Sequence, residues 1–349
     1  MTVSKLTKNY SPFPLFLAAA VYIMASPVFW SGVEEQDHVQ ANLIRGNMDL
    51  FTEVIPTIQY GFSRLRQGEL PLWNDRQMCG TPFFANPAHG LFQPVNMVFL
   101  FFDIPRALAL HAFISLSLMG IFFTLFMRSL GVLYIPATLG GIVYICCGAS
   151  AAAMSRPAVA NALVWMPLLL WAVRIYLKQP RLVSVIVGSI VLALLWLSGS
   201  PMMALVITVF IGFYAVCAVL FDKSVNRGLL SGRSRNQIRT IAGLLTMLII
   251  AAGITSIQWL PALYWGRTLA NPSAYFGKFT VPGIMPEDIR SLLLQFIQVQ
   301  SGDLPVLGYI GTSTLLLLPV ALLHNLPRWE RAFFAVASST IVVAAVING

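Results

Sequence analysis

The stretch ALALHAFISLSLMGIFFTLFM, from Ala107 to Met127, contains no Asp, Glu, Lys or Arg. At about 1.5 Å per residue, a helix of this length crosses the roughly 30 Å hydrocarbon core of a bilayer. Similar runs recur along the chain, in which 57% of the residues are hydrophobic and 10% are charged, with a mean hydropathy of +0.77. Soluble domains carry about 25% charged residues, so the composition predicts an integral membrane protein.

We expect an all-α, polytopic fold with about nine membrane helices, forming one membrane domain over residues 1–349. The first candidate span is predicted to be a retained anchor, because no small-x-small cleavage site follows its run of about 18 apolar residues. Gly and Ser dilute the third and fifth spans. The nine predicted spans cover residues 13–30, 107–127, 135–154, 159–177, 182–197, 202–221, 241–263, 307–323 and 332–347.

The basic residues predict the orientation of these spans. With a cytoplasmic N-terminus, 13 of the 22 Lys and Arg residues fall in the short segments on the cytoplasmic side. Only two of the 13 acidic residues, Asp222 and Glu330, fall there. This distribution follows the positive-inside rule. The net charge of +9 therefore reflects topology and contact with anionic membrane lipids, and no basic-aromatic motif points to a nucleic-acid partner.

Metal-binding signals are weak. The four cysteines, Cys79, Cys146, Cys147 and Cys217, form no CxxC pair and no Cys/His zinc spacing, and they predict no disulfide framework. The acidic cluster Glu34, Glu35 and Asp37, just after the first span, is a solvated surface, or it supplies a second catalytic acid or ligands for a divalent metal ion.

Two extracytoplasmic segments are too long to be simple connectors, and they cover residues 31–106 and 264–306. Within the first, Asp49 to Leu70 has the pattern of an amphipathic helix that lies in the membrane interface. Gly68 is expected to end this helix, and Asp49 stands at its N-cap position. The apolar residues of the pattern are Phe51, Val54, Ile55, Ile58, Phe62 and Leu65.

Turn-forming residues follow this helix, in Leu70–Asp75 and Gly80–Pro87. A dozen mostly apolar residues then end at Phe102, which is too few to span a bilayer. Such a segment is re-entrant or interfacial, and irregular backbone at that depth is tolerated where protein or a cavity covers it. The first loop is therefore expected to form a cavity at the outer membrane face.

The motif of this loop resembles the YfhO family of bacterial membrane proteins, which is related to the GT-C glycosyltransferases. The matching residues are Asp49, Leu50, Gly68, Leu70, Pro71, Leu72, Trp73, Asn74, Gly80, Pro82, Ala85, Asn86, Pro94 and Asn96. Weaker similarity follows at 165–167, 197–199 and 308–311. The chain departs from the family at Ser200, where relatives often have His after Gly199. Family members are usually longer, so the chain is consistent with the N-terminal part of a longer protein.

The resemblance implies a GT-C-like fold in the bacterial cytoplasmic (inner) membrane. The implied activity is transfer of a sugar from a polyprenyl-phosphate donor to a cell-envelope acceptor on the extracytoplasmic face. A divalent metal ion assists some relatives. GT-C enzymes place an acidic residue in the first outer loop, and Asp49 is the matching position. It would act as general base on the acceptor hydroxyl; the structural alternative is a helix cap.

The other candidates are substrate-binding residues, each with a structural alternative. Trp73 would stack on the sugar or anchor the loop in the interface. Arg267 would bind the donor phosphate or extend to the lipid headgroups. Gln258 would line the cavity or bond a neighbouring helix. The remaining candidates for sugar contacts, which are equally suited to turns, are Asn74, Asn86, His89 and Gln93.

Two other functions fit the composition: a transporter or flippase of a lipid-linked envelope precursor, and a non-catalytic membrane scaffold. Transporters usually carry ionisable groups at mid-membrane depth and internal repeats. The predicted spans show no repeat, and Arg174, near an inner end, is their one candidate for a buried charge. The pattern therefore favours chemistry at the membrane surface.

Overall fold

A computed structural model describes residues 50–77, 79–146, 150, 153–154, 156–221, 233–268, 329–330 and 333. This part of the chain is mostly helical. Four of its helices are long and apolar enough to cross a membrane: α7 (Ile104–Ser129), α10 (Pro157–Lys178), α12 (Pro201–Phe221) and α13 (Arg233–Thr268). Two shorter apolar helices, α8 (Tyr134–Ile145) and α11 (Leu182–Trp196), lie among them.

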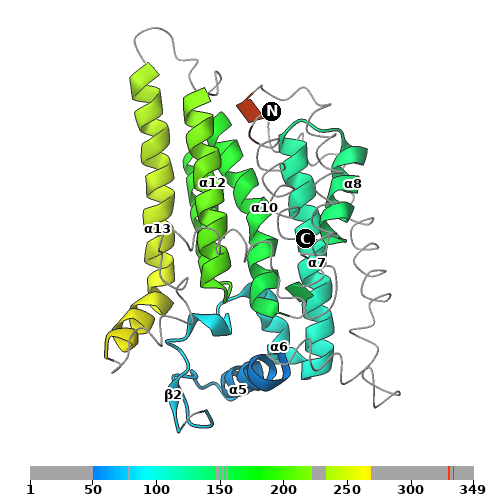
Figure 1. Ribbon diagram of the computed structural model, residues 1–349, viewed down its shortest axis with the longest axis vertical. Helices are drawn as coiled ribbons and strands as arrows, with labels where there is room; N and C mark the ends of the chain where they lie inside the picture. Colours follow the sequence, from blue (N-terminus) through cyan, green and yellow to red (C-terminus); the bar gives the residue numbers. More distant parts are fainter. Residues whose placement is uncertain are drawn as a thin grey trace, which may run out of the picture.

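The six helices form a bundle with α10 at its centre (Figure 1). α10 packs against α7, α11 and α12, while α8 packs on α7 and α13 on α11. Buried side chains such as Leu116, Val164 and Tyr214 fill the core. Apolar side chains also cover the outside, including Phe213 and Ile249, which are 60% and 71% exposed. An outward apolar face of this kind is suited to contact with hydrocarbon.

Six of the nine predicted spans fall on these helices. The second, fourth, sixth and seventh are confirmed as long apolar helices. The third and fifth coincide with the short helices α8 and α11, and these are the two spans whose sequences Gly and Ser dilute. The third is shorter than predicted, because α8 ends at Ile145 rather than continuing to residue 154. The first, eighth and ninth predicted spans, and the second long loop beyond Thr268, lie outside the described residues.

The first loop covers the end of the bundle where α7 begins. It comprises a π-helical turn η1 (Leu50–Val54), α5 (Ile55–Arg66), the strands β1 (Trp73–Asn74) and β2 (Thr81–Pro82), the 3-10 turns η2 (Pro87–His89) and η3 (Pro94–Met97), and α6 (Val98–Phe101). The strands are antiparallel, with Trp73 opposite Pro82 and Asn74 opposite Thr81. Figure 1 shows α5 nearly end-on, lying across the foot of the bundle.

The predicted amphipathic helix is confirmed over η1 and α5. Its apolar side chains Ile58 and Phe62 pack against Phe99 of α6 and Ala107 of α7. The Arg66 guanidinium donates to the carbonyl oxygens of Phe99, Leu100 and Phe102 at 2.8–2.9 Å. It thereby satisfies backbone acceptors that the end of a short helix leaves unpaired. These contacts hold α5 across the bundle axis.

The segment after β2 enters the bundle without crossing it, as predicted. Gln93 is fully buried, and its Nε2 donates to the carbonyl oxygen of Leu194 at 2.5 Å. Its Oε1 accepts from the indole Nε1 of Trp165 at 2.8 Å. Gly90 lies so close to the turn after α11 that a Cβ there would be 3.2 Å from the Ser198 carbonyl oxygen. The irregular backbone is thus covered by protein, as its depth requires.

A buried polar network fixes the same segment to the long helices. Asn161 of α10 donates from Nδ2 to Oδ1 of Asn96 at 3.0 Å. Its Oδ1 lies 3.1 Å from Nε2 of His111 on α7. Asn96 in turn donates to the Gly90 carbonyl oxygen at 2.8 Å. Buried polar groups are costly unless paired, so this network specifies one way of docking the loop.

A second buried polar cluster lies at the opposite end of the bundle. Arg174 of α10 donates to the Ser129 carbonyl oxygen at 3.2 Å and to the Tyr214 hydroxyl at 2.9 Å. It also forms an ion pair with Glu330, whose Oε1 accepts from the Tyr214 hydroxyl at 3.1 Å. Arg174, the one span charge expected from the sequence, is therefore buried and neutralised by a residue 156 positions later.

Candidate functional site

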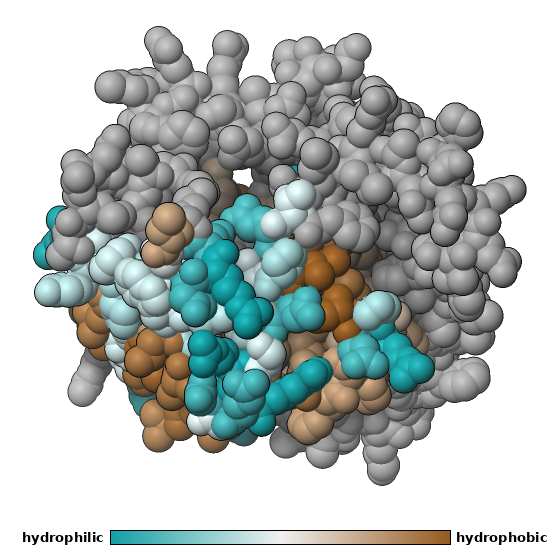
Figure 2. Space-filling model, turned by 90° about the horizontal axis from the view of Figure 1, so that it is seen from below, coloured by the Kyte–Doolittle hydropathy of each residue, from teal (hydrophilic) through white to brown (hydrophobic). Residues whose placement is uncertain are grey.

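A polar cavity of about 480 Å³ lies in the first loop, at the end of the bundle covered by α5. It is formed by η1 and α5 on one side and by the turn after β1 on the other. Viewed from this end, the described surface has hydrophilic residues gathered at its middle, with hydrophobic residues beside them (Figure 2). The side chains that give the cavity its chemistry are Thr52, Glu53, Gln59, Tyr60, Asn74 and Arg76.

The amphipathic pattern of α5 explains one wall of this cavity. The apolar face of α5 packs against α6 and α7, so its opposite face, with Gln59 and Ser63, is left for solvent and the cavity, and Glu53 of η1 continues this polar side. The helix ends at Arg66 and the chain then turns through Gly68, at a φ of +78° that glycine adopts readily. This turn sends the chain back past the polar face of α5.

The other wall is held in place by Tyr60 and Asn74. The Tyr60 hydroxyl donates to the carbonyl oxygen of Trp73 at 2.7 Å. The side-chain Oδ1 of Asn74 accepts from the backbone N–H of Arg76 at 3.0 Å, a local turn typical of Asn. The turn brings the Arg76 guanidinium to 5.9 Å from the centre of the Tyr60 ring, within the range of a cation–π contact.

The cavity therefore combines one carboxylate, one guanidinium, three side-chain amides and an aromatic ring. Glu53 can accept hydrogen bonds from hydroxyl groups, and Arg76 can bind an anionic group such as a phosphate. Beside it, Arg64 pairs with Glu69 at 2.5 Å, and this hydrogen bond raises the pKa of the exposed Arg64 guanidinium. This set of groups suits a ligand that carries both hydroxyls and negative charge.

Asp49, the predicted catalytic residue, lies outside the described residues. The described chain begins at Leu50, and Thr52, only three positions after Asp49, already lines the cavity. The acidic cluster Glu34, Glu35 and Asp37 also lies outside the described part. Within that part, no group of three or more His, Cys, Asp or Glu side chains is placed to hold a metal ion.

Of the predicted substrate-binding residues, Asn74 lines the cavity. Asn86 instead caps η2, because its Oδ1 accepts from the backbone N–H of Ala88 at 3.0 Å. Its carbonyl oxygen accepts from Gln258 at 3.3 Å, so Gln258 contacts the loop. Gln93 is the buried bridge to Trp165 and Leu194 described above.

His89 packs inside the loop. Its ring lies 4.1 Å from the Phe83 ring, centre to centre, and Nδ1 is 3.1 Å from the Phe83 carbonyl oxygen. Burial disfavours the charged imidazolium and lowers the pKa of His89 to about 4. His89 is therefore neutral at pH 7 and belongs to the packing of the loop.

Trp73 and Arg267 lie at the same end of the molecule. The half-exposed Trp73 ring meets Trp265 of α13 edge to face, with ring centres 5.7 Å apart. It also covers Gly80, where a Cβ would come within 2.7 Å of its Nε1. Arg267 is exposed, two residues beyond Trp265, and does not line the cavity. The contact between the two Trp residues thus joins α13 to the strands of the loop.

Glu53, Tyr60 and Arg76 were not identified as site residues from the sequence alone. For Glu53 a signal was present, because the apolar face of an amphipathic helix defines the polar face opposite, whereas Arg76 lies in the turn after β1. Which polar face meets which turn depends on the fold of the loop. Comparison with protein-family models, curated proteins and solved structures gave no match.

Proposed function

We propose that the chain is a membrane glycosyltransferase that transfers a sugar from a polyprenyl-phosphate donor to a cell-envelope acceptor. The observation that supports this most is the polar cavity, which adjoins the segment after Asp49 at one end of an apolar helix bundle. A donor with a lipid tail and a phosphate needs an apolar environment beside a polar site. The proposal includes an extracytoplasmic cavity and a cytoplasmic N-terminus, as the basic residues favour.

The proposed roles follow from the chemistry of the lining. Arg76 would bind the donor phosphate, whose charge grows as it leaves. Glu53, Gln59 and Asn74 would bind sugar hydroxyls. Asp49 would take the proton from the acceptor hydroxyl while that oxygen forms a bond to the anomeric carbon. The bond between this carbon and the phosphate oxygen breaks, and polyprenyl phosphate leaves with the electron pair.

The test compares wild type with Asp49→Asn, Glu53→Gln and Asp103→Asn at matched membrane levels. Cells that lack the chain are complemented with each variant, and envelope glycans are compared by mass spectrometry. Asp103 is the control, since it is an exposed acid at the start of α7 and does not line the cavity. We expect the added sugar to disappear with Asp49→Asn and to persist with Asp103→Asn.

The other possible outcomes would reassign the catalytic base or contradict the proposed activity. An active Asp49→Asn with an inactive Glu53→Gln would transfer the role of base to Glu53. Full activity in both would contradict a catalytic role for either carboxylate. Identical glycans with and without the wild-type chain would contradict the glycosyltransferase proposal and favour the transporter or scaffold.

A further inference from the structure

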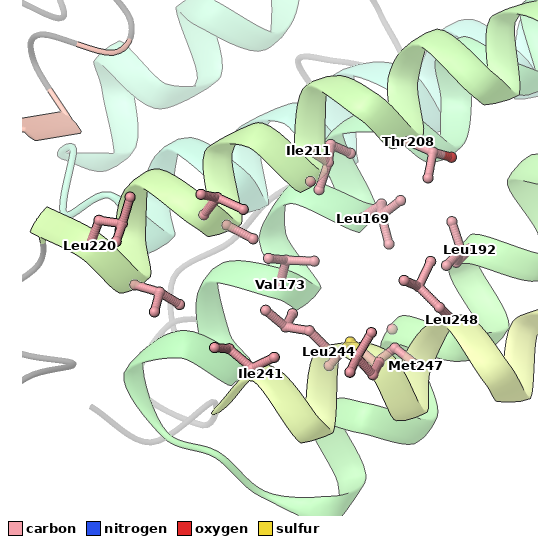
Figure 3. A pocket seen from close by; sticks show the side chains of 16 residues that line it. Leu169, Val173, Leu192, Thr208, Ile211, Leu220, Ile241, Leu244, Met247 and Leu248 are labelled. Carbon is pink, nitrogen blue, oxygen red and sulfur yellow. The ribbon is translucent and has the colours of Figure 1, made fainter. Parts of the chain in front are cut away.

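A second cavity, of about 350 Å³, opens between α12 and α13. Figure 3 shows side chains of α10, α12 and α13 converging on it, among them Val173, Ile211 and Leu244. Its floor consists of buried residues such as Val173 and Ile211, whereas its rim includes Val216 and Leu245, which are 54% and 52% exposed. The cavity is therefore a crevice that opens on the outer surface of the bundle.

The lining offers no polar group to a ligand. Its one polar side chain, Thr208, donates from Oγ1 to the Ala204 carbonyl oxygen at 2.6 Å and accepts from Nε1 of Trp196 at 3.2 Å. A buried water needs two to four polar partners, and this lining supplies none that is free. The crevice is therefore suited to a hydrocarbon chain.

The length and position of the crevice match about one half of a bilayer. The crevice runs along α12 from Thr208 to Leu220, which is about 18 Å at 1.5 Å per residue. This is little more than half of the roughly 30 Å hydrocarbon core. Leu220 lies near the end of α12 and Ile241 near the start of α13, so the crevice occupies the half of the bundle remote from the polar cavity.

Basic residues occur at the start of α13, next to the end of the crevice. α13 starts at Arg233, and its first two turns contain Arg233, Arg235 and Arg239, just before Ile241 of the lining. Between residues 222 and 239 the sequence has five basic residues and one acidic residue. Basic clusters at a helix end attract anionic headgroups at the membrane surface.

We propose that this crevice binds one acyl chain of an anionic phospholipid, whose headgroup lies against the basic first turns of α13. The lipid fills the space between α12 and α13, because α13 packs mainly on α11 rather than on α12. This site is independent of the proposed glycosyl transfer, because it lies at the other end of the bundle.

The test uses Gly212→Leu, which places a side chain in the crevice. A Cβ at Gly212 meets nothing within 4 Å, so the substitution fills space without a clash. The matched control is Gly253→Leu on α13, where a Cβ also meets nothing but the position does not line the crevice. Val216→Trp, at the exposed rim, is a second variant that closes the opening without entering the core.

Binding of phosphatidylglycerol to the delipidated full chain is measured by native mass spectrometry in detergent. We expect both crevice variants to bind about tenfold more weakly than wild type, as expulsion of about two methylene groups would cause. Gly253→Leu should bind as wild type does. Equal binding by wild type, Gly212→Leu and Val216→Trp would overturn the site.

Phosphatidylcholine with the same chains tests the headgroup. At low salt, phosphatidylglycerol should bind more tightly than phosphatidylcholine. Added salt should reduce this difference in affinity, because it screens the charges. Equal binding at low salt would overturn the anionic headgroup. Displacement of bound phosphatidylglycerol from wild type by equimolar polyprenyl phosphate would overturn the phospholipid as occupant and assign the crevice to the donor lipid.

Discussion

Gln93 is the residue that ties the first loop most directly to the helix bundle, through Trp165 and the Leu194 carbonyl oxygen. Replacing it with Leu keeps the side-chain size but leaves the Trp165 N–H unpaired. We expect Gln93→Leu to lower the free energy of unfolding by about 1–3 kcal/mol. Thermal unfolding in detergent measures the change, and Gln59→Leu on the exposed face of α5 should alter stability by less than about 0.5 kcal/mol.

A double-mutant cycle with Trp165→Phe isolates the hydrogen bond itself. Such bonds between membrane helices contribute about 0.6 kcal/mol on average and at most about 1.7. The double variant should therefore lose less stability than the two single variants together. Strict additivity would show that the bond contributes nothing.

His89 predicts a pH dependence of stability. Its pKa is about 4 in the folded chain and near 6.5 when unfolded, because burial disfavours the imidazolium. Above pH 6.5 the ring is neutral in both the folded and the unfolded chain, so its titration does not change the free energy of unfolding. As the pH falls from 6.5 to 4, the unfolded chain binds a proton that the folded chain does not, so stability decreases. Below about pH 4 this loss levels off.

His89→Phe keeps a ring against Phe83 and removes the titration. Unfolding temperatures at pH 7.5, 5.5 and 4.5 should therefore fall less steeply for His89→Phe than for wild type. Parallel pH profiles for the two proteins would contradict the shifted pKa of His89.

Among the elements, the approach of the loop to the end of α11 depends on Gly90. Its φ is +56°, and a Cβ would lie 2.9 Å from Asn96 Nδ2 and 3.2 Å from the Ser198 carbonyl oxygen. Gly68 also has a positive φ, but a Cβ there meets nothing within 4 Å. In both Gly→Ala variants the free energy of unfolding should fall by about 1–2 kcal/mol, because alanine is strained in the left-handed backbone conformation.

Gly90→Ala should lower the free energy of unfolding by about 1–3 kcal/mol more than Gly68→Ala does, because the added methyl group is forced into a packed contact. Chemical or thermal unfolding of the two variants in the same detergent measures this difference. Equal losses would mean that the loop and the turn after α11 are not in close contact at Gly90.

Local sequence patterns predicted where the helices lie better than they predicted which residues these helices contact. The uncharged run at Ala107–Met127 and the apolar spacing of Ile58, Phe62 and Leu65 were sufficient to predict α7 and α5. The partners of Gln93, 72 and 101 residues away, were not predictable, because hydrogen-bond pairing depends on how helices assemble. The sequence indicated Asn74 as a candidate for sugar contacts, but not Glu53 and Arg76, because which side chains meet across the cavity depends on how the loop folds.

For the whole molecule, the Arg174–Glu330 ion pair connects α10 and α12 to a position near the end of the sequence. Removing one partner leaves the other charge buried and uncompensated, which typically costs 3–5 kcal/mol. We expect Arg174→Gln and Glu330→Gln each to destabilise the protein by about that amount. Thermal unfolding of the detergent-purified full chain measures both.

The double variant Arg174→Gln/Glu330→Gln should recover much of the loss, since neither charge then remains alone. If its loss equals the sum of the single losses, the two residues are not paired. The sequence indicated Arg174 as a charge in a span, but only the fold identifies a partner separated from it by several helices.

The docking of the first loop also constrains the order in which the chain can mature during synthesis. Gln93 and Asn96 leave the ribosome well before Trp165, Asn161 and Leu194, with which they pair. When residues 83–102 first reach the membrane, these two side chains have no helix to receive them. The loop therefore reaches its final position only after α10 and α11 have been inserted, and until then the insertion machinery or water must solvate its polar groups.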